Sequence, residues 1–221
     1  MDANTIRELI IVVPALVLAI TIHEVSHGYV ANRLGDPTAK FMGRLTLNPI
    51  KHVDPIGTII MPLALYFFSG GRFVFGYAKP VPINPHNFKD PRRDMAVSAA
   101  AGPVTNIILA IFSQIILAHL IIPVMNSISG GVSVAVLKPM ALMFHASLEI
   151  NIILAVINLI PIPPLDGGRL LIGFLPQKMA MSYSKIERYG FLIVIFLFIT
   201  RIAHVIIYPV VAVLYILITS I

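Results

Sequence analysis

The sequence predicts an all-α, polytopic membrane protein with about 5–6 transmembrane or re-entrant helices. A small β-hairpin or sheet insertion is expected near the cytoplasmic face. Of the 221 residues, 57% are hydrophobic and 12% are charged, whereas a soluble domain carries roughly 25% charged residues. Mean hydropathy is +0.90, and apolar stretches of about 20 residues, the length of one span, recur along the chain. An ordinary soluble enzyme is therefore excluded, and the lack of Cys excludes disulfides and thiolate metal sites.

Five apolar stretches define the predicted spans. The first is too long, and contains too many polar residues, to be a signal peptide. The second holds 13 residues, which is short for a crossing. The last is interrupted by polar residues, so that it forms either one helix or two. The five stretches are Leu9 to about Leu34, Ile56–Phe68, about Met95–Leu120, about Pro139–Ile160 and Tyr189–Ile221.

Two topologies follow from the short second stretch. If every stretch spans the bilayer, the 16 Lys and Arg residues divide 10 to 6 between the two sides. If Ile56–Phe68 dips in and returns, Arg33–Arg93 and Arg169–Arg188 share one side, and the division becomes 13 to 3. The positive-inside rule favours this second topology, with the N-terminus outside. The net charge of +6 then marks cytoplasmic loops, and no basic stripe with interleaved aromatics predicts a nucleic-acid partner.

The predicted β-insertion lies on either side of the short stretch. Gly43–Leu47 and Phe73–Ile83 contain alternating or β-rich pieces that end at proline. Non-helical backbone at membrane depth must be shielded by protein or water. A small sheet packed beside a re-entrant segment would satisfy that requirement.

The first span contains the ionisable residues His23, Glu24 and His27, in an H-E-x-x-H pattern. Positions i and i+4 share one face of a helix, so both imidazoles can bind one metal ion. Glu24 is then placed to take a proton from water at that metal. Ionisable groups inside a span are costly and usually mark function, which makes a chance occurrence of the pattern the weaker interpretation.

A catalytic zinc site needs a third protein ligand and an open position for water. Asp166 is the candidate, because it follows the fourth apolar stretch within the segment NLIPIPPLDGG, whose prolines prevent a regular helix. The alternative is that Asp166 caps the next helix. In the re-entrant topology, His23 lies about two-thirds of the way to the inner face, and Asp166 lies in the same half of the bilayer. Geometry therefore favours the ligand.

An H-E-x-x-H pattern in a transmembrane helix, followed downstream by N-x-x-P-x-P-x-x-D-G-G, resembles the site-2 protease family of intramembrane zinc metalloproteases. Three further segments resemble its compact bacterial and archaeal members, and the resemblance covers most of residues 8–170. These segments are GRLTLNP (Gly43–Pro49), GYAKPVPINP (Gly76–Pro85) and AAAGPVTN (Ala99–Asn106).

The resemblance implies regulated intramembrane proteolysis, in which a peptide bond within or at the edge of a substrate transmembrane helix is hydrolysed. It implies one zinc ion per chain, with Glu24 as the general base. The implied zinc ligands are His23, His27 and Asp166. Asn158 matches a residue that holds the substrate backbone, or it bonds the nearby turn at its helix end. Asn106 either binds substrate in the same way or bridges helices.

The implied organisation is a single integral-membrane metalloprotease domain over residues 1–221. Its motif-bearing core covers about 8–170, its C-terminal helices cover about 186–221, and its length leaves no room for the PDZ or CBS domains of larger relatives. The implied partners are transmembrane protein substrates and the lipid bilayer, and the pattern is compatible with a monomer or an oligomer. The expected location is a prokaryotic cell membrane, with the active site towards the cytoplasmic side.

Two rival functions use the same residues. A membrane transporter or channel could pass metal ions or protons through intramembrane His, Glu and Asp, but such proteins often show repeated halves, and the sequence contains no repeat. A silent binder of membrane helices could keep the fold without catalysis. The intact Glu24 argues against that function, because a silent site needs no base.

Overall fold

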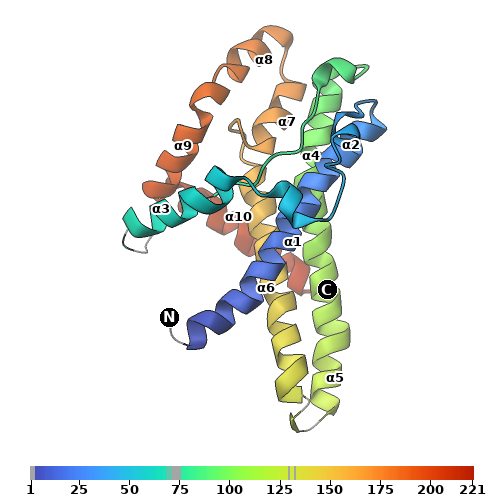
Figure 1. Cartoon of the computed structure of the whole chain (residues 1–221), viewed down its shortest axis with the longest axis vertical. Coiled ribbons are helices and arrows are strands. Elements are labelled where there is room, and N and C mark those ends of the chain that lie inside the picture. Colours follow the sequence, from blue (N-terminus) through green and yellow to red (C-terminus); the bar gives the residue numbers. More distant parts are fainter. Residues whose placement is uncertain (1–2, 69, 71–75, 129, 132) are drawn as a thin grey trace.

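The computed structural model describes residues 3–68, 70, 76–128, 130–131 and 133–221, and every regular element in these ranges is helical (Figure 1). Within the described residues, four helical stretches are long and apolar enough to cross a membrane, which makes the chain an integral membrane protein. They belong to α1 (Ala3–Arg33), α4 (Pro91–Ile116) with its continuation α5 (Ile122–Ser127), α6 (Lys138–Asn158) and α10 (Ile202–Thr219).

Helix α4 is the centre of the bundle and contacts α1, α6, α7 (Asp166–Phe174) and α10. Figure 1 shows α4 and α6 side by side along the long axis of the molecule, with α1 crossing them. Small and branched side chains of α4, α6 and α10 form the buried apolar core. These residues are Ala110, Leu148, Ile152, Val156, Ala203, Ile207 and Ile218.

The outer faces of the spanning helices carry many exposed large apolar side chains. On a soluble protein, contiguous apolar surface of this kind would mark an interaction site. Around a bundle with four candidate spans, it is the surface that faces lipid. Examples are Leu9, Ile10 and Val13 on α1, Val104, Ile108 and Phe112 on α4, Ile153 on α6 and Val205, Val213 and Leu217 on α10.

The segment between α1 and α4 begins and ends at the same end of the bundle. Asp36, just after α1, accepts hydrogen bonds of 2.7 Å from the backbone N–H of Asn84 and from Asn87 Nδ2, just before α4. Between them, the helical stretch Pro55–Phe68 is about 21 Å long, too short for a hydrocarbon core of about 30 Å. It comprises a π-helical part, Pro55–Ile60, and α3 (Met61–Phe68). Of the two topologies left open by the sequence, this length and the Asp36 contacts favour the one in which Ile56–Phe68 does not cross.

The predicted β-insertion is not found in the described residues. Residues 43–47 form bends and turns, and residues 76–84 are extended without pairing as a strand. Part of the predicted second piece, residues 73–75, lies outside the described residues. The physical reason for the difference is that Pro80 and Pro82 have no backbone N–H to donate to a ladder. The extended segment instead makes isolated hydrogen bonds. The backbone N–H of Lys79 donates to the carbonyl oxygen of His52, and the Lys79 carbonyl accepts from the guanidinium of Arg44.

The last apolar stretch forms two helices, α9 (Glu187–Ile199) and α10, which are separated at Arg201. Arg201 adopts a left-handed backbone conformation with φ of 62°. With 13 residues, α9 is too short to span the bilayer alone. It is reached from α7 through α8 (Gln177–Ser184). Of the two possibilities left by the sequence, the structure has two helices, and α10 alone is long enough to cross.

The Asp36 junction predicts an acid-sensitive contribution to stability. Burial raises the pKa of Asp36, but hydrogen bonds from Thr38, Asn87 and Asn84 lower it by more, so that the pKa lies below its ordinary value. A carboxylate with a depressed folded-state pKa stabilises the fold above about pH 4, and this contribution is lost as the pH falls through the folded pKa. We expect Asp36→Asn to lower the unfolding free energy by about 1–3 kcal/mol at pH 7 and to weaken the acid dependence.

Thermal unfolding in detergent between pH 3 and pH 7 measures both effects. The control is Glu187→Gln, because the Glu187 side chain is 47% exposed and its ion pair with Arg169 is 3.5 Å long. Exposed pairs of this kind contribute little. Equal pH profiles for the wild type and Asp36→Asn would contradict the assignment.

Candidate active site and metal centre

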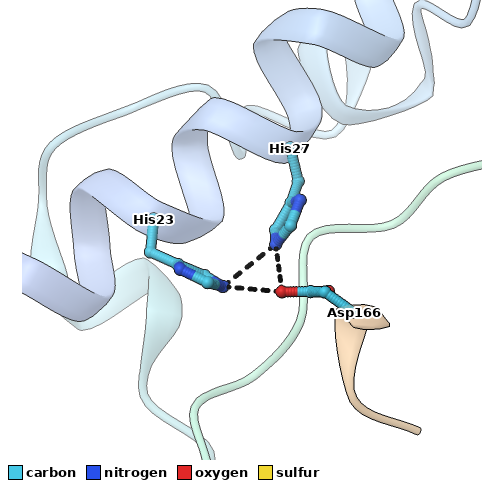
Figure 2. Close-up of side chains that lie close together, drawn as sticks. All are labelled: His23, His27 and Asp166. Atoms are coloured by element: carbon cyan, nitrogen blue, oxygen red, sulfur yellow. Dashed lines mark hydrogen bonds and ion pairs between the residues drawn. The ribbon is translucent and has the colours of Figure 1, made fainter. Parts of the chain in front are cut away.

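Three buried ligand groups meet where α1 approaches the start of α7 (Figure 2). His23 and His27 lie one turn apart on α1, so their imidazoles leave the same face of the helix. Asp166 is the first residue of α7. The exposed fractions are 6% for His23, 8% for His27 and 8% for Asp166, so the group is enclosed by protein.

The three facing atoms form a nearly equilateral triangle. His23 Nε2 and His27 Nε2 are 3.0 Å apart, and Asp166 Oδ2 lies 3.1 Å from the first and 3.2 Å from the second. Ligand atoms of a tetrahedral zinc ion, with metal bonds of about 2.0–2.1 Å, lie about 3.3–3.4 Å from one another. The triangle is therefore close to the size of three corners of a zinc site.

The protonation pattern of the imidazoles also fits a cation. His27 Nδ1 lies 2.8 Å from the backbone carbonyl oxygen of Ser98, and His23 Nδ1 contacts Asn106 Oδ1. Because both partners are acceptors, each Nδ1 carries a hydrogen, so that in the neutral imidazole each Nε2 has a lone pair that faces Asp166. Asp166 Oδ2 is buried and receives no hydrogen bond from the described residues. Three acceptors this close repel one another unless a cation lies between them, so the residues fit a metal ion.

Irregular backbone brings Asp166 back to α1. Helix α6 ends at Asn158 and α7 begins at Asp166, and the prolines between them prevent a continuous helix. The chain folds so tightly that a Cβ atom on Gly167 would lie 2.3 Å from the carbonyl oxygen of Leu159. Only glycine fits this approach, and the approach fixes the position of the neighbouring Asp166.

One face of α4 supports both histidines. Ser98, Gly102 and Asn106 are spaced by four residues, so they share a face. Ser98 and His27 bond each other reciprocally, because Ser98 Oγ also donates to the backbone carbonyl of His27, at 3.0 Å. A Cβ atom on Gly102 would lie 2.5 Å from His27 Nε2 and 2.6 Å from His23 Nε2. Gly102 therefore keeps the space around the facing nitrogens clear.

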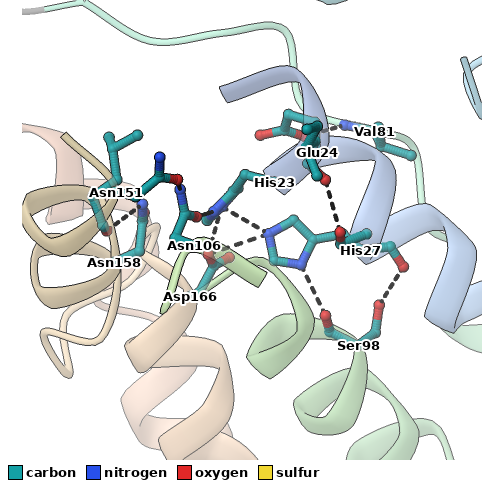
Figure 3. A network of polar contacts seen from close by, with 12 residues as sticks. His23, Glu24, His27, Val81, Ser98, Asn106, Asn151, Asn158 and Asp166 are labelled. Atoms are coloured by element: carbon teal, nitrogen blue, oxygen red, sulfur yellow. Dashed lines mark hydrogen bonds and ion pairs between the residues drawn. The ribbon is translucent and has the colours of Figure 1, made fainter. Parts of the chain in front are cut away.

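Glu24 lies next to His23 on α1, and its carboxylate contacts the extended segment 76–84 (Figure 3). Its Oε2 accepts a hydrogen bond of 2.8 Å from the backbone N–H of Val81. The same segment is held by the buried Arg44, whose guanidinium donates to the carbonyl oxygens of Lys79, at 2.9 Å, and Pro80, at 3.3 Å. The segment thereby fixes the direction of the Glu24 carboxylate.

The two asparagines singled out from the sequence lie in different surroundings. Asn158 is half-buried at the end of α6, and its Nδ2 donates to the carbonyl of Leu154 at 3.0 Å. Asn106 is fully buried, and both ends of its amide are used, one by His23 and one by Asn151. Their roles towards substrate stay predictions.

Sequence reasoning did not single out Ser98, Gly102 or Val81. The first two carry a signal, since an S-x-x-x-G-x-x-x-N spacing matches the i, i+4 spacing of the two histidines on a facing helix. Val81 carries none, because it acts through its backbone N–H, which the residue type does not reveal.

The space at Gly102 predicts a sharp effect of one methyl group. In Gly102→Ala the added Cβ must push the imidazoles apart, and displacement by about 1 Å costs about 100-fold in activity. We expect the zinc content of the purified Gly102→Ala protein to fall together with its activity. The control is Gly131→Ala, where an added Cβ meets no atom within 4 Å. Zinc content and proteolysis at wild-type levels in Gly102→Ala would show that this site geometry is wrong.

Comparison with known proteins identifies the family. Residues 11–149 and 119–200 match the family described as Peptidase family M50. The chain is 37% identical over 194 residues to "Putative zinc metalloprotease YwhC" of Bacillus subtilis, covering 88% of this chain and 82% of that protein. It is 28% identical over 208 residues to "Putative zinc metalloprotease Rip2" of Mycolicibacterium smegmatis, covering 90% and 72%. No solved structure matches the chain. The chain belongs to peptidase family M50, the site-2 protease family of zinc metalloproteases.

Proposed function

We propose that the chain is an intramembrane zinc metalloendopeptidase that hydrolyses peptide bonds within or at the edge of substrate transmembrane helices. The observation that carries the proposal is the buried convergence of His23, His27 and Asp166. His23 and His27 lie beside Glu24 on α1, a helix that is apolar enough to span a membrane. A cluster of ionisable side chains is costly inside a bilayer. A site that binds a metal ion and supplies a general base explains why these residues are present.

His23, His27 and Asp166 would hold one zinc ion and leave a fourth position open, as in catalytic zinc sites. Zinc bound there would supply Lewis-acid chemistry, activating water and polarising the scissile carbonyl. Ser98 and Asn106 orient the two imidazoles through their Nδ1 atoms. Such outer partners fix ring orientation and raise ligand basicity.

Glu24 acts as the general base. Its carboxylate takes one proton from the attacking water, and the remaining hydroxide adds to the scissile carbonyl carbon. The same carboxyl group returns that proton to the leaving amine nitrogen as the C–N bond breaks. The N–H of Val81 bonds the carboxylate form and aims it. Asn158, half-buried at the end of α6, would bond substrate backbone that becomes exposed when the substrate helix unwinds in lipid.

The topology of this enzyme is re-entrant at Pro55–Phe68, with residues 33–93 and 169–188 on the cytoplasmic side of a prokaryotic cell membrane. Two independent observations support this: the Asp36–Asn84 contact between the two ends of the segment, and the 13-to-3 division of basic residues. A single catalytic domain covers residues 1–221, with its motif-bearing core at about 8–170 and C-terminal helices at about 186–221. Its substrates are transmembrane proteins.

The transporter or channel alternative has less support. A conducting site needs binding that is weak enough to release the ion along a path. The triangle is instead enclosed, with each ligand at most 8% exposed, and the chain shows similarity to metalloproteases over most of its length.

The proposed base gives the functional test. We expect Glu24→Gln to keep about one zinc ion per chain, since no ligand is changed, and to lose about 10²–10⁴-fold in cleavage rate, since a glutamine cannot take the proton. Cleavage is measured on single-span transmembrane reporters that the wild type cleaves in proteoliposomes.

Glu149→Gln is the matched control, because Glu149 also lies one turn from a histidine in a spanning helix, with His145 Nδ1 at 3.8 Å, but outside the site. Wild-type cleavage by Glu24→Gln would refute the assigned base. If both Glu24→Gln and Glu149→Gln failed to cleave reporters that the wild type cleaves, the loss would not be specific to Glu24. That result would also count against the proposal.

A further inference from the structure

A buried row of polar side chains leads from the metal centre through α4 into α6 (Figure 3). Asn106 Oδ1 contacts His23 Nδ1, and Asn106 Nδ2 donates to Asn151 Oδ1 at 2.8 Å. Asn151 Nδ2 then donates to the backbone carbonyl oxygen of Ser147, also at 2.8 Å. Asn106 is 0% exposed and Asn151 is 1% exposed. Asn151 appears in neither conspicuous sequence motif, and the mechanism above does not use it.

The hydrogen bonds along this row can run in only one direction, from donor to acceptor. The carbonyl of Ser147 can only accept, so Asn151 must turn its NH₂ group towards it and its Oδ1 towards Asn106. Asn106 must then present its own NH₂ group to Asn151 and its Oδ1 to His23. His23 Nδ1 must consequently carry the hydrogen, which leaves the lone pair of Nε2 directed at the metal position. A fixed backbone acceptor on α6 thus determines which nitrogen of His23 is free to bind metal.

The reverse orientation is excluded by burial. A flipped Asn106 would set its NH₂ group against Nδ1, which would then have to lose its hydrogen to Nε2, where a hydrogen blocks metal binding. In an open site, water could satisfy either orientation. At 0–1% exposure, the flipped amides would leave buried donors and acceptors without partners, each of which is costly.

We propose that Asn151 is a positioning residue of the zinc site, and that it acts by holding the Asn106 amide in the orientation that makes His23 Nε2 a ligand. The inference rests on the proposed function, because it requires His23 to bind zinc. It goes further by assigning part of the zinc affinity to a residue on α6, which supplies no ligand.

A purely structural role predicts something different. Buried amides between helices also act as interhelical hydrogen bonds, and in that role Asn151 would contribute to thermal stability without changing zinc affinity. A replacement of Asn151 must therefore be judged by metal affinity and by unfolding temperature together.

The experiment measures zinc affinity of the full-length, zinc-loaded protein in detergent, by competition with a chromophoric chelator. We expect Asn151→Leu to weaken zinc binding by about 10-fold or more, within the range of about 10–100-fold for outer partners of metal ligands. Asn151→Ala is a second, smaller replacement with the same expectation. Asn151→Asp keeps an acceptor facing Asn106, and we expect its affinity to stay within about 3-fold of the wild type.

The decisive arm repeats Asn151→Leu in an Asn106→Asp background. A carboxylate presents an oxygen to His23 whichever way it turns, so it no longer needs Asn151. The structure therefore predicts that Asn151→Leu changes zinc affinity by less than about 2-fold in this background, a strong non-additivity of the kind that coupled neighbours show.

Gln114→Leu is the control for a lost buried amide. Gln114 lies on the same helix as Asn106, is 8% exposed, and donates to the carbonyl of Thr219 at 3.5 Å, outside the row. We expect a lower unfolding temperature and unchanged zinc affinity for this variant.

Two results would overturn the inference: zinc affinity of Asn151→Leu and Asn151→Ala within about 2-fold of the wild type, or an equal loss in the wild-type and Asn106→Asp backgrounds. Retention of zinc in His23→Ala, measured in the same series, would instead show that the proposed zinc site itself is wrong. The two failures are thus distinguishable.

Discussion

The structure depends on holding three hydrogen-bond acceptors together in a buried site enclosed by helices. His23 Nε2, His27 Nε2 and Asp166 Oδ2 lie 3.0–3.2 Å apart, an arrangement that is repulsive without a cation. The surrounding helices are built to impose it. Residues of α4 direct both Nδ1 atoms outward and keep the space beside the Nε2 atoms clear. The proline-rich segment after α6 brings Asp166 back to α1, so that sequence positions 139 residues or more apart become one site.

The lipid environment explains why so much of the support is polar. In a membrane bundle, the hydrophobic effect does not drive the helices together. Small residues and interhelical hydrogen bonds therefore become important where two helices are in contact. Helix α4 meets α1 through Ser98, Gly102 and Asn106, and it meets α6 through the bond between Asn106 and Asn151. The same contacts thus pack the bundle and orient the ligands. In the irregular residues 76–84, Glu24 accepts from the backbone N–H of Val81 and Arg44 donates to the carbonyl of Lys79, so protein groups satisfy part of this backbone.

Much of the fold could be predicted because its causes are local. An apolar stretch reveals a span, an i, i+4 pair of histidines reveals a shared face, and prolines before Asp166 reveal irregular backbone. The prediction of a helical membrane protein is confirmed by α1, α4, α6 and α10. The predicted β-insertion is not found in the described residues, because Pro80 and Pro82, within the β-rich residues 73–83, have no N–H groups to donate to a neighbouring strand. Asn151 could not be recognised, because its role arises only when α4 packs against α6. The spacing of Ser98, Gly102 and Asn106 is visible in the sequence, but it gains its meaning only when α4 packs against α1.

The central claim is that His23, His27 and Asp166 hold one zinc ion jointly. The most direct test is the zinc content and zinc X-ray absorption spectrum of detergent-purified protein, for the wild type beside His23→Ala and Asp166→Ala. The account predicts about one zinc per chain in the wild type, with nitrogen and oxygen ligands at about 2.0–2.2 Å and no sulfur, and loss of that zinc in both variants. Full zinc content in Asp166→Ala, with an unchanged spectrum, would contradict it.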